Sequence, residues 1–380
     1  MPQRTFAILV ALTIAGVLSA RPQSQSPLPS STYQVNDSHV HLTNYIQEGT
    51  NIHAFLDVMG HRVGRAVLFG IPLQQTWAWG NTGAFAPTYY LQSDAPLYYY
   101  SFTDAAIATA YKSLTPAERA RFDPMITGFN PADMYAVDHV RRVLKTFPGV
   151  FEGIGEFTIH KEFVSAKVAG ETASLKNPAL DRLLDFAAEV GLVTLMHNDI
   201  DEPFPKGPAP TTPSVSYDAP TPSTVYPTPF QIPQLRDLFL RHPQTTMIWA
   251  HVGLGRVVRP VHDQIEMIDK LLSDQRLHRL HIDLSWDETA KYIVATPETV
   301  AATAALINRH PDRFLFGTDE VAPTNQPKYL KVYDMYAPLF AALTPETSER
   351  VRKKNYERLF DEARLRVRAW EQMNVTESTR

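Results

Sequence analysis

Short apolar runs alternate with amphipathic stretches along most of this chain. Eight runs end at a turn signal or a polar residue, and each is followed by a stretch with helical periodicity. This alternation predicts parallel strands that are buried on both faces and joined by helices. The predicted strands are residues 34–39, 65–70, 124–129, 151–156, 192–197, 246–251, 280–285 and 313–318. Eight such units predict an α/β fold, the (β/α)8 or TIM barrel.

Capping signals mark several of the predicted helices. Asn177-Pro178 combines an N-cap with a proline at the first helical position, and Gly191 ends the apolar face that follows. Thr115, Thr296 and Thr344 each precede a proline in the same way. These signals give the predicted helices defined starts.

Two long segments interrupt the alternation. Residues 72–102 are rich in aromatic side chains, and residues 201–230 hold nine of the chain's 30 prolines. So much proline cannot continue a helix or a central strand, so an extended loop is expected. Both insertions would lie over the C-terminal face of the barrel, where we expect a lid or a substrate wall. The alternatives are a disordered excursion for the proline-rich segment and a homodimer contact for the aromatic one.

The first residues have the pattern of a secretory signal peptide. Arg4 precedes a short apolar run, and the small residues Ser19 and Ala20 offer a cleavage site. The run is too short to span a bilayer comfortably, so an uncleaved anchor is the weaker alternative. We therefore expect export, to a periplasm or to the extracellular space. The predicted divisions are a signal peptide at residues 1–20, a polar mature tail at residues 21–33 and one barrel domain at residues 34–370.

The composition of the chain limits which metal ligands and which partners are possible. The chain has no cysteine, so any metal must be held by nitrogen and oxygen atoms. The formal net charge is -4, and lysine and arginine are scattered along the chain rather than clustered, which argues against a nucleic-acid partner. No later stretch is apolar enough for a membrane helix. The expected partner is a small-molecule substrate.

Residues of metal-binding types stand at the ends of five predicted strands. They are His39, His41, Glu156, His197, His251 and Asp319. His39 and His41 are two positions apart on a strand, so their side chains share one face. Parallel barrels collect catalytic residues at the C-terminal ends of different strands. Three or four nitrogen and oxygen ligands with one position left for water are typical of a catalytic zinc site.

Other polar residues near these ends have less specific interpretations. Glu156 is either a ligand that bridges two metals or a carboxylate that orients a histidine. Asp37 and Asp283 either orient a histidine or cap a turn. Trp286 is expected to line the substrate pocket, and Arg256 to anchor a substrate carboxylate.

These residues resemble the amidohydrolase superfamily, in particular the amidohydrolase-related branch that includes relatives of aminocarboxymuconate-semialdehyde decarboxylase. The motifs that carry the resemblance are Asp37-Ser-His39-Val-His41, His197, His251-Val-Gly253, Phe316-Gly-Thr-Asp319 and the closing Asn355-Tyr-Glu-Arg-Leu-Phe360. Glu156 is similar to the fourth-strand glutamate of TatD-like members, which bridges two metals.

The resemblance implies a metal-dependent hydrolase that cleaves an amide, ester or lactone. One or two divalent ions per chain, most often zinc in such proteins, would sit on His39, His41, His197 and Asp319, with Glu156 added in a two-metal site. Asp319 would accept a proton from the attacking water and return it to the leaving group. His251 would polarise the substrate carbonyl, unless it binds a second metal.

Three rival functions use the same residues differently. A non-oxidative decarboxylase of an aromatic or unsaturated acid would keep the site and release carbon dioxide. A metal-free lactonase would keep the barrel without the ion. An exported binding protein would keep the barrel and lack the chemistry.

Overall fold

The computed structural model describes most of the chain between residues 33 and 375. The described residues are 33–44, 47–72, 102–161, 164–165, 167–168, 171–172, 174–200, 231–255 and 258–375. All of them belong to one structural unit, residues 32–380. The predicted signal peptide, nearly all of the polar tail and of both insertions, and Arg256 lie outside the described residues.

Each of the eight predicted strands has a counterpart in a parallel sheet. The strands are β1 (Val35–Asp37), β2 (Val40–Thr43), β3 (Val63–Gly70), β4 (Phe122–Ile126), β5 (Gly153–Lys161), β9 (Val193–Asn198), β10 (Thr246–Trp249), β11 (Leu280–Asp283), β12 (Phe314–Leu315) and β13 (Glu320–Val321). β4 begins two residues before the predicted position, at Phe122. Of the eighth predicted strand, residues 313–318, only Phe314 and Leu315 form a strand, β12, and β13 begins after the predicted end. Short antiparallel pieces follow β5, namely β6 (Val164–Ser165), β7 (Lys167–Val168) and β8 (Glu171–Thr172).

The sheet closes on itself through its last segment. Its order is β12-β11-β10-β9-β5-β4-β3-β2-β13, so the two halves of the eighth segment stand at opposite ends of the path. The backbone N–H of Ser38 donates to Phe316 O at 3.0 Å, and that of Asp319 donates to His39 O at 2.7 Å. These bonds join the first segment to the last. The predicted TIM barrel is confirmed.

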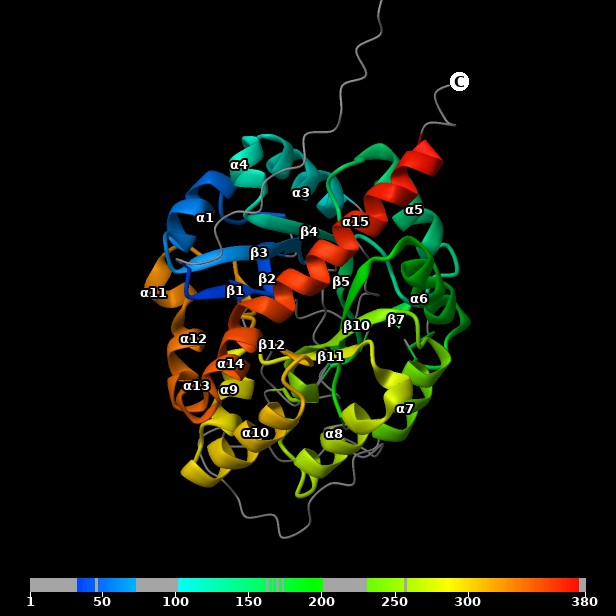
Figure 1. Cartoon of the computed structure of the whole chain (residues 1–380). Helices are drawn as coiled ribbons and strands as arrows, with labels where there is room; N and C mark the ends of the chain where they lie inside the picture. Colours follow the sequence, from blue (N-terminus) through cyan, green and yellow to red (C-terminus); the bar gives the residue numbers. More distant parts are fainter. Residues whose placement is uncertain are drawn as a thin grey trace, which may run out of the picture. The chain divides into compact units, whose positions relative to one another are not determined.

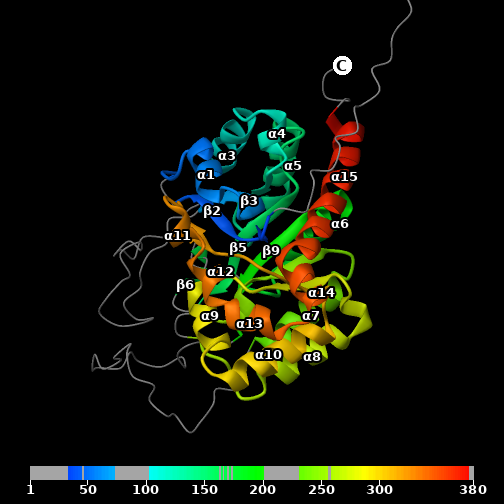
Figure 2. The same ribbon diagram turned by 60° about the vertical axis from the view of Figure 1, so that its left-hand side comes forward.

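Helices surround the strands, as Figures 1 and 2 show. They are α1 (Ile52–Met59), α3 (Phe102–Lys112), α4 (Pro116–Arg119), α5 (Ala136–Thr146), α6 (Pro178–Val190), α7 (Ile232–Arg241), α8 (Gln264–Ser273), α9 (Asp287–Ile293), α10 (Pro297–Arg309), α11 (Gln326–Tyr329), α12 (Lys331–Met335), α13 (Ala337–Ala342), α14 (Pro345–Glu349) and α15 (Asn355–Val375). The predicted caps hold: Asn177 accepts from Ala179 N, and Gly191 ends α6 in the left-handed region. Thr115 forms a capping box with Glu118. Among the described residues, no helix has the length and apolarity needed to cross a membrane.

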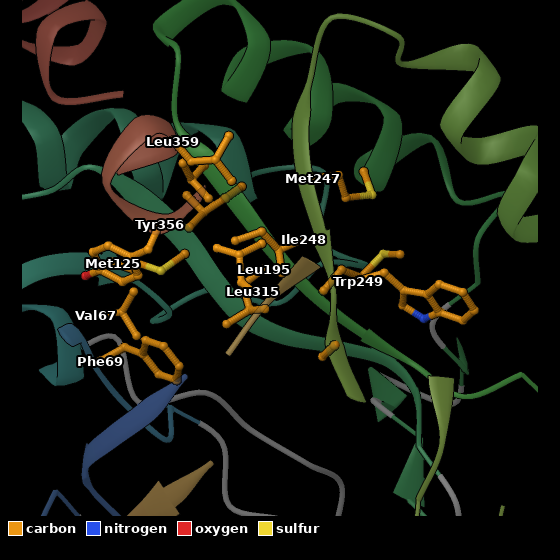
Figure 3. Close-up of a cluster of buried hydrophobic side chains, with 14 of the residues drawn as sticks. Val67, Phe69, Met125, Leu195, Met247, Ile248, Trp249, Leu315, Tyr356 and Leu359 are labelled. Atoms are coloured by element: carbon orange, nitrogen blue, oxygen red, sulfur yellow. The ribbon is translucent and has the colours of Figure 1, made fainter. Parts of the chain in front are cut away.

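The core has an inner and an outer layer. Figure 3 shows Leu195, Ile248 and Leu315 close together, while Trp249 lies on the other side of its strand. All four side chains are fully buried. Trp249 packs against Phe239 of α7, with ring centroids 6.4 Å apart. Successive strand residues therefore fill the barrel interior and the strand–helix layer in turn, as strand periodicity requires.

A charged cluster closes the N-terminal ends of the strands. Arg65 of β3 and Arg364 of α15 contact the buried Asp123 carboxylate at 2.7 and 2.6 Å. Arg368 of α15 contacts Glu152, directly before β5, at 2.5 Å. In Figure 1, α15 (red) runs across these strands. Guanidinium groups thus bind the last helix to the barrel, at the end that supports stability rather than catalysis in such folds.

Candidate metal centre

Polar side chains from different strands meet inside the C-terminal end of the barrel. His39 lies between β1 and β2, His41 in β2, Glu156 in β5 and His197 in β9, whereas His251 follows β10 and Asp319 follows β12. The structure brings all six predicted residues together. The side chains of Glu156 and Asp319 are 9% and 13% exposed, whereas that of His39 is fully buried.

One group of ligand atoms forms around Asp319. Its Oδ1 lies 3.2 Å from His39 Nε2 and 3.1 Å from His41 Nε2. Glu156 Oε2 lies 3.7 and 3.5 Å from the same two nitrogens. One atom from each of the four side chains lies within 4.8 Å of the others, a spacing that can enclose a metal ion.

A second group shares Glu156 with the first. Glu156 Oε1 lies 2.7 Å from His197 Nδ1 and 3.4 Å from His251 Nε2. These three side chains also meet the 4.8 Å spacing. One Glu156 oxygen therefore faces each group, which is the position that a bridging carboxylate would take.

The local backbone forces these side chains inward. Three residues have positive φ values, namely 58° at His251, 56° at Asp319 and 75° at Trp286. Residues other than glycine rarely adopt this region of backbone conformation. Each such residue costs about 1–3 kcal/mol, and the surrounding structure must supply that energy. Gly317 allows the first and last segments to approach, because a Cβ there would lie 2.7 Å from His39 Cβ. Steric crowding at His39 thus explains why the Phe-Gly-Thr-Asp motif has glycine at this position.

Three histidines of the cluster each have one ring nitrogen that faces the cluster and one, the outer nitrogen, that faces away from it. In all three, a hydrogen-bond partner holds the outer nitrogen. His39 Nδ1 lies 2.9 Å from Asp283 Oδ2, and His197 Nε2 lies 3.1 Å from Asp199 Oδ1. His251 Nδ1 lies 2.8 Å from Ser285 Oγ. Such partners fix the ring orientation and the tautomer of histidines that bind metals.

The hydroxyl of Ser285 fixes the tautomer of neutral His251. It donates to Asp283 Oδ1 at 2.5 Å, so its oxygen must accept from His251 Nδ1. Neutral His251 then carries its lone pair on Nε2, toward Glu156. Asp283 also accepts from the His251 backbone N–H at 2.8 Å, which holds the strained turn in place.

Burial and opposite charges act together on the titratable groups. Burial by itself would lower the pKa of His39, but the carboxylates of Asp319, Asp283 and Glu156 outweigh it and raise the pKa well above its usual value. Burial also disfavours the charged forms of Glu156 and Asp319, yet His39 holds both pKa values well below normal. Burial lowers the pKa of His251. Within this cluster, the carboxylates of Glu156 and Asp319 stay ionised beside His39, whose positive charge compensates them, whereas His251 is held in its neutral form.

The donor atoms fit a divalent cation. Among the described residues, His39 Nε2 and His251 Nε2 are buried without a hydrogen-bond partner, although both face carboxylates. A buried nitrogen without a partner is costly, and a metal ion would satisfy it. The nitrogen and oxygen set is compatible with zinc and with several other divalent metals.

The part of the chain that forms this site matches the model of a known protein family. The model described as amidohydrolase matches residues 37–361 and so includes every residue of the cluster. The protein belongs to the amidohydrolase family. No curated protein sequence matches it closely enough to add to this assignment.

Solved structures support the fold of this amidohydrolase. A TIM-barrel protein of Bordetella bronchiseptica is 14% identical with a TM-score of 0.50, over 87% of this chain and 99% of that one. A probable 2-pyrone-4,6-dicarboxylic acid hydrolase of Acinetobacter baumannii is 10% identical with a TM-score of 0.50, over 86% and 99%. A Rhizobium 2,6-dihydroxybenzoate decarboxylase is 13% identical with a TM-score of 0.46, over 87% and 98%. At these identities the first two structures bear on the fold alone, and the third, with its lower TM-score, adds nothing to that argument.

An aromatic wall stands beside the cluster of this amidohydrolase. The ring of Trp286 lies 5.2 Å from that of His251 and 6.5 Å from that of His197, between centroids. The Lys161 ammonium lies 5.3 Å from the Trp286 centroid. Trp286 therefore lies beside two histidines of the cluster, and its role as a wall of the substrate pocket stays a prediction.

Two side chains that contact histidines of the cluster were not predicted from the sequence. Asp199 and Ser285 each come two residues after a residue of the site, His197 and Asp283, and that spacing was the only available signal. Asp283 is now placed as the residue that orients His39. Asp37 accepts from Thr318 Oγ1 at 2.7 Å and thereby joins the first strand to the Asp319 loop.

Proposed function

We propose that this amidohydrolase is a metal-dependent hydrolase that cleaves a C–N or C–O bond of a small molecule, as in an amide, ester or lactone. One observation supports this most strongly. Three buried histidines turn their outer nitrogen to a fixed partner and their inner nitrogen to Glu156 or Asp319. That is how proteins prepare imidazoles for a metal ion.

The residues that would hold an ion follow from the two groups. His39, His41, Glu156 and Asp319 would hold the first, and Glu156, His197 and His251 a second. When bound, a divalent ion such as zinc supplies Lewis acidity that lowers the pKa of a water to about 7. We propose zinc as the natural ion, because nitrogen and oxygen ligands with an open position suit it.

Asp319 is suited to move the proton. The pKa of its carboxyl is held well below normal, so the carboxylate is ionised, and it faces both His39 and His41. It would accept a proton from the attacking water and deliver it to the nitrogen or oxygen that leaves. General acid–base catalysis of this kind contributes about 10²–10⁴ to the rate.

His251 could either bind a second metal ion or polarise the substrate carbonyl, and its hydrogen bonds favour the first role. With Nδ1 donating to Ser285, neutral His251 offers only a lone pair from Nε2. A lone pair suits a ligand of a second ion, whereas polarising a carbonyl needs a proton on that nitrogen. We therefore propose a two-metal centre.

The reaction and the metal number have separate tests. Zinc-loaded protein is offered lactones, esters and amides alongside hydroxybenzoates, and acid release and carbon dioxide are both recorded. Metal-dependent acid release supports the hydrolase, and carbon dioxide release instead would establish the decarboxylase. About two zinc ions per chain, falling toward one in His251→Ala, support the bridged pair. One ion that His251→Ala leaves in place would make His251 a substrate-polarising residue.

We also propose export of the mature protein. The support is the charged start, short apolar run and small residues of the first twenty positions. N-terminal sequencing of protein secreted by a host cell tests it. A mature chain that begins near residue 21 is expected, and an intact Met1 would contradict cleavage.

A further inference from the structure

The buried carboxylate of Asp37, two residues before His39, is held by hydrogen bonds on both of its oxygens. Its Oδ1 accepts from the backbone N–H of His39 at 3.0 Å and from that of Thr318 at 2.9 Å. Its Oδ2 accepts from Thr318 Oγ1 at 2.7 Å and from the phenol of Tyr329 at 2.8 Å. Thr318 directly precedes Asp319 in the chain. One carboxylate therefore holds the backbone beside two members of the centre.

Of these donors, only Tyr329 comes from outside the two segments that carry His39 and Asp319. Tyr329 is the last residue of α11, and its side chain is fully buried. Burial and the carboxylate of Asp37 raise the pKa of this phenol well above its usual value, so the hydroxyl keeps the proton that it donates. The hydrogen bond to Asp37 is therefore present at every pH at which the protein would be studied.

The helix that carries Tyr329 is itself fixed to α1. Gln326, at the start of α11, donates from Nε2 to Val58 O at 2.9 Å. The ring of Tyr329 packs edge-on against that of Phe55, with centroids 5.2 Å apart. Figures 1 and 2 both show α11 beside α1. The hydroxyl thus has a position set by the outer helices, and a polar group that is fully bonded in this way makes its surroundings rigid.

We infer that Tyr329 is a positioning residue of the metal centre: its hydroxyl keeps Asp37 turned toward the backbone of the first and last segments, and so fixes where His39 and Asp319 stand. This inference rests on the proposed metal-dependent function. Tyr329 acts through Asp37 and takes no part in bond cleavage. Ligand distances in a metal site vary by only about 0.2 Å, so a small relaxation of these segments should weaken the binding of an ion.

Tyr329→Phe tests the inference, because it removes the hydroxyl and keeps the ring that packs against Phe55. Competition with a coloured chelator should show that the affinity for zinc falls about tenfold, at the lower end of the loss expected when the support of a metal ligand is removed. Exchange of the His39 and Thr318 amide hydrogens in metal-free protein, followed by NMR, should become faster, because their shared acceptor is released.

Tyr356 provides a matched control at the other end of the barrel. Its phenol is also buried and donates to a buried carboxylate, that of Asp123, at 2.7 Å. Tyr356→Phe should lower the free energy of unfolding and leave the zinc affinity and the exchange of the His39 and Thr318 amides unchanged. A merely structural role of Tyr329 would give the same result in Tyr329→Phe, and a zinc affinity equal to that of the control would overturn the inference.

Amide exchange separates failure of this inference from failure of the proposed function. Wild-type protein that binds no zinc would contradict the metal-dependent function. In that case, faster exchange of the two amides in Tyr329→Phe would still support the positioning of His39 and Thr318 by Tyr329. Exchange that matches the wild type would overturn it.

Discussion

Both ends of this barrel bury carboxylates, but they compensate them with different cations. At the N-terminal end, Asp123 and Glu152 meet the guanidinium groups of Arg65, Arg364 and Arg368. At the C-terminal end, the buried carboxylates meet histidines. Guanidinium groups stay charged at every physiological pH, whereas imidazoles can lose their proton.

The two ends of the barrel thus separate groups that stabilise the fold from groups suited to chemistry. At the N-terminal end, guanidinium groups that stay charged balance the buried carboxylates, so no bound ion is needed there. An imidazole that loses its proton offers a lone pair instead, so charge balance at the C-terminal end passes to an exchangeable cation. Substitutions should therefore affect stability at one end and chemistry at the other.

Asp319→Asn should give the largest effect. The amide cannot accept the proton from water, so the kcat of zinc-loaded enzyme should fall about 10²–10⁴-fold. Retained zinc, measured by elemental analysis, would show that the centre survives. Undiminished turnover would remove Asp319 from the mechanism.

Arg364→Met probes the opposite end. The buried Asp123 would keep Arg65 but lose its second guanidinium, at a cost of about 2–4 kcal/mol in the free energy of unfolding. Urea denaturation measures this cost, and zinc content should not change. Arg350→Met, which removes surface pairs with Glu346 and Asp312, should cost under about 1 kcal/mol. Equal losses in the two variants would mean that the N-terminal cluster has no special role in stability.

Asp283→Asn should weaken metal binding without unfolding the protein. The carboxylate orients His39 and, through Ser285, His251, so its loss should lower zinc affinity about 10–100-fold. Competition with a coloured chelator measures the affinity. The matched control is Asp185→Asn, because Asp185 accepts from His242 Nδ1 at 2.8 Å away from the centre. A zinc affinity that matches this control would contradict the orienting role.

The smallest effect concerns the pH dependence of stability. Burial raises the pKa of Glu152 from 4.5 to about 7, despite the lowering effect of Arg368 and Arg364. The folded protein then keeps a proton that the unfolded chain releases, so this residue makes stability fall as pH rises from 4.5 to 7. Glu152→Gln should remove this contribution to the decline, measured as unfolding free energies at pH 5 and pH 8. Glu362→Gln, at an exposed site, should leave the decline in place.

The sequence predicts one end of the barrel better than the other, for a physical reason. A histidine after a buried apolar run, such as His197 or His251, is conspicuous because it stands where a strand must end. The residues that orient these histidines, Asp199 and Ser285, resemble ordinary loop residues until the fold is known. The division of the last strand was also missed, because the positive φ of Asp319 cannot be read from periodicity.

The N-terminal cluster left no local signal at all. Arg364 is separated from Asp123 by 241 residues, and both look like ordinary surface charges in the sequence. Only the path of α15 across the strands brings them together. Periodicity predicts strands and helices, but contacts between distant charges depend on how those elements pack.

Zinc content tests the central claim, that an exchangeable cation completes the C-terminal cluster. Wild-type protein, His39→Ala and Arg364→Met are dialysed against zinc, then against metal-free buffer, and analysed for bound metal. We expect at least one tightly held zinc ion per chain in the wild type and in Arg364→Met, and its loss in folded His39→Ala. Wild-type protein that retains no zinc, or as much as His39→Ala, would contradict it.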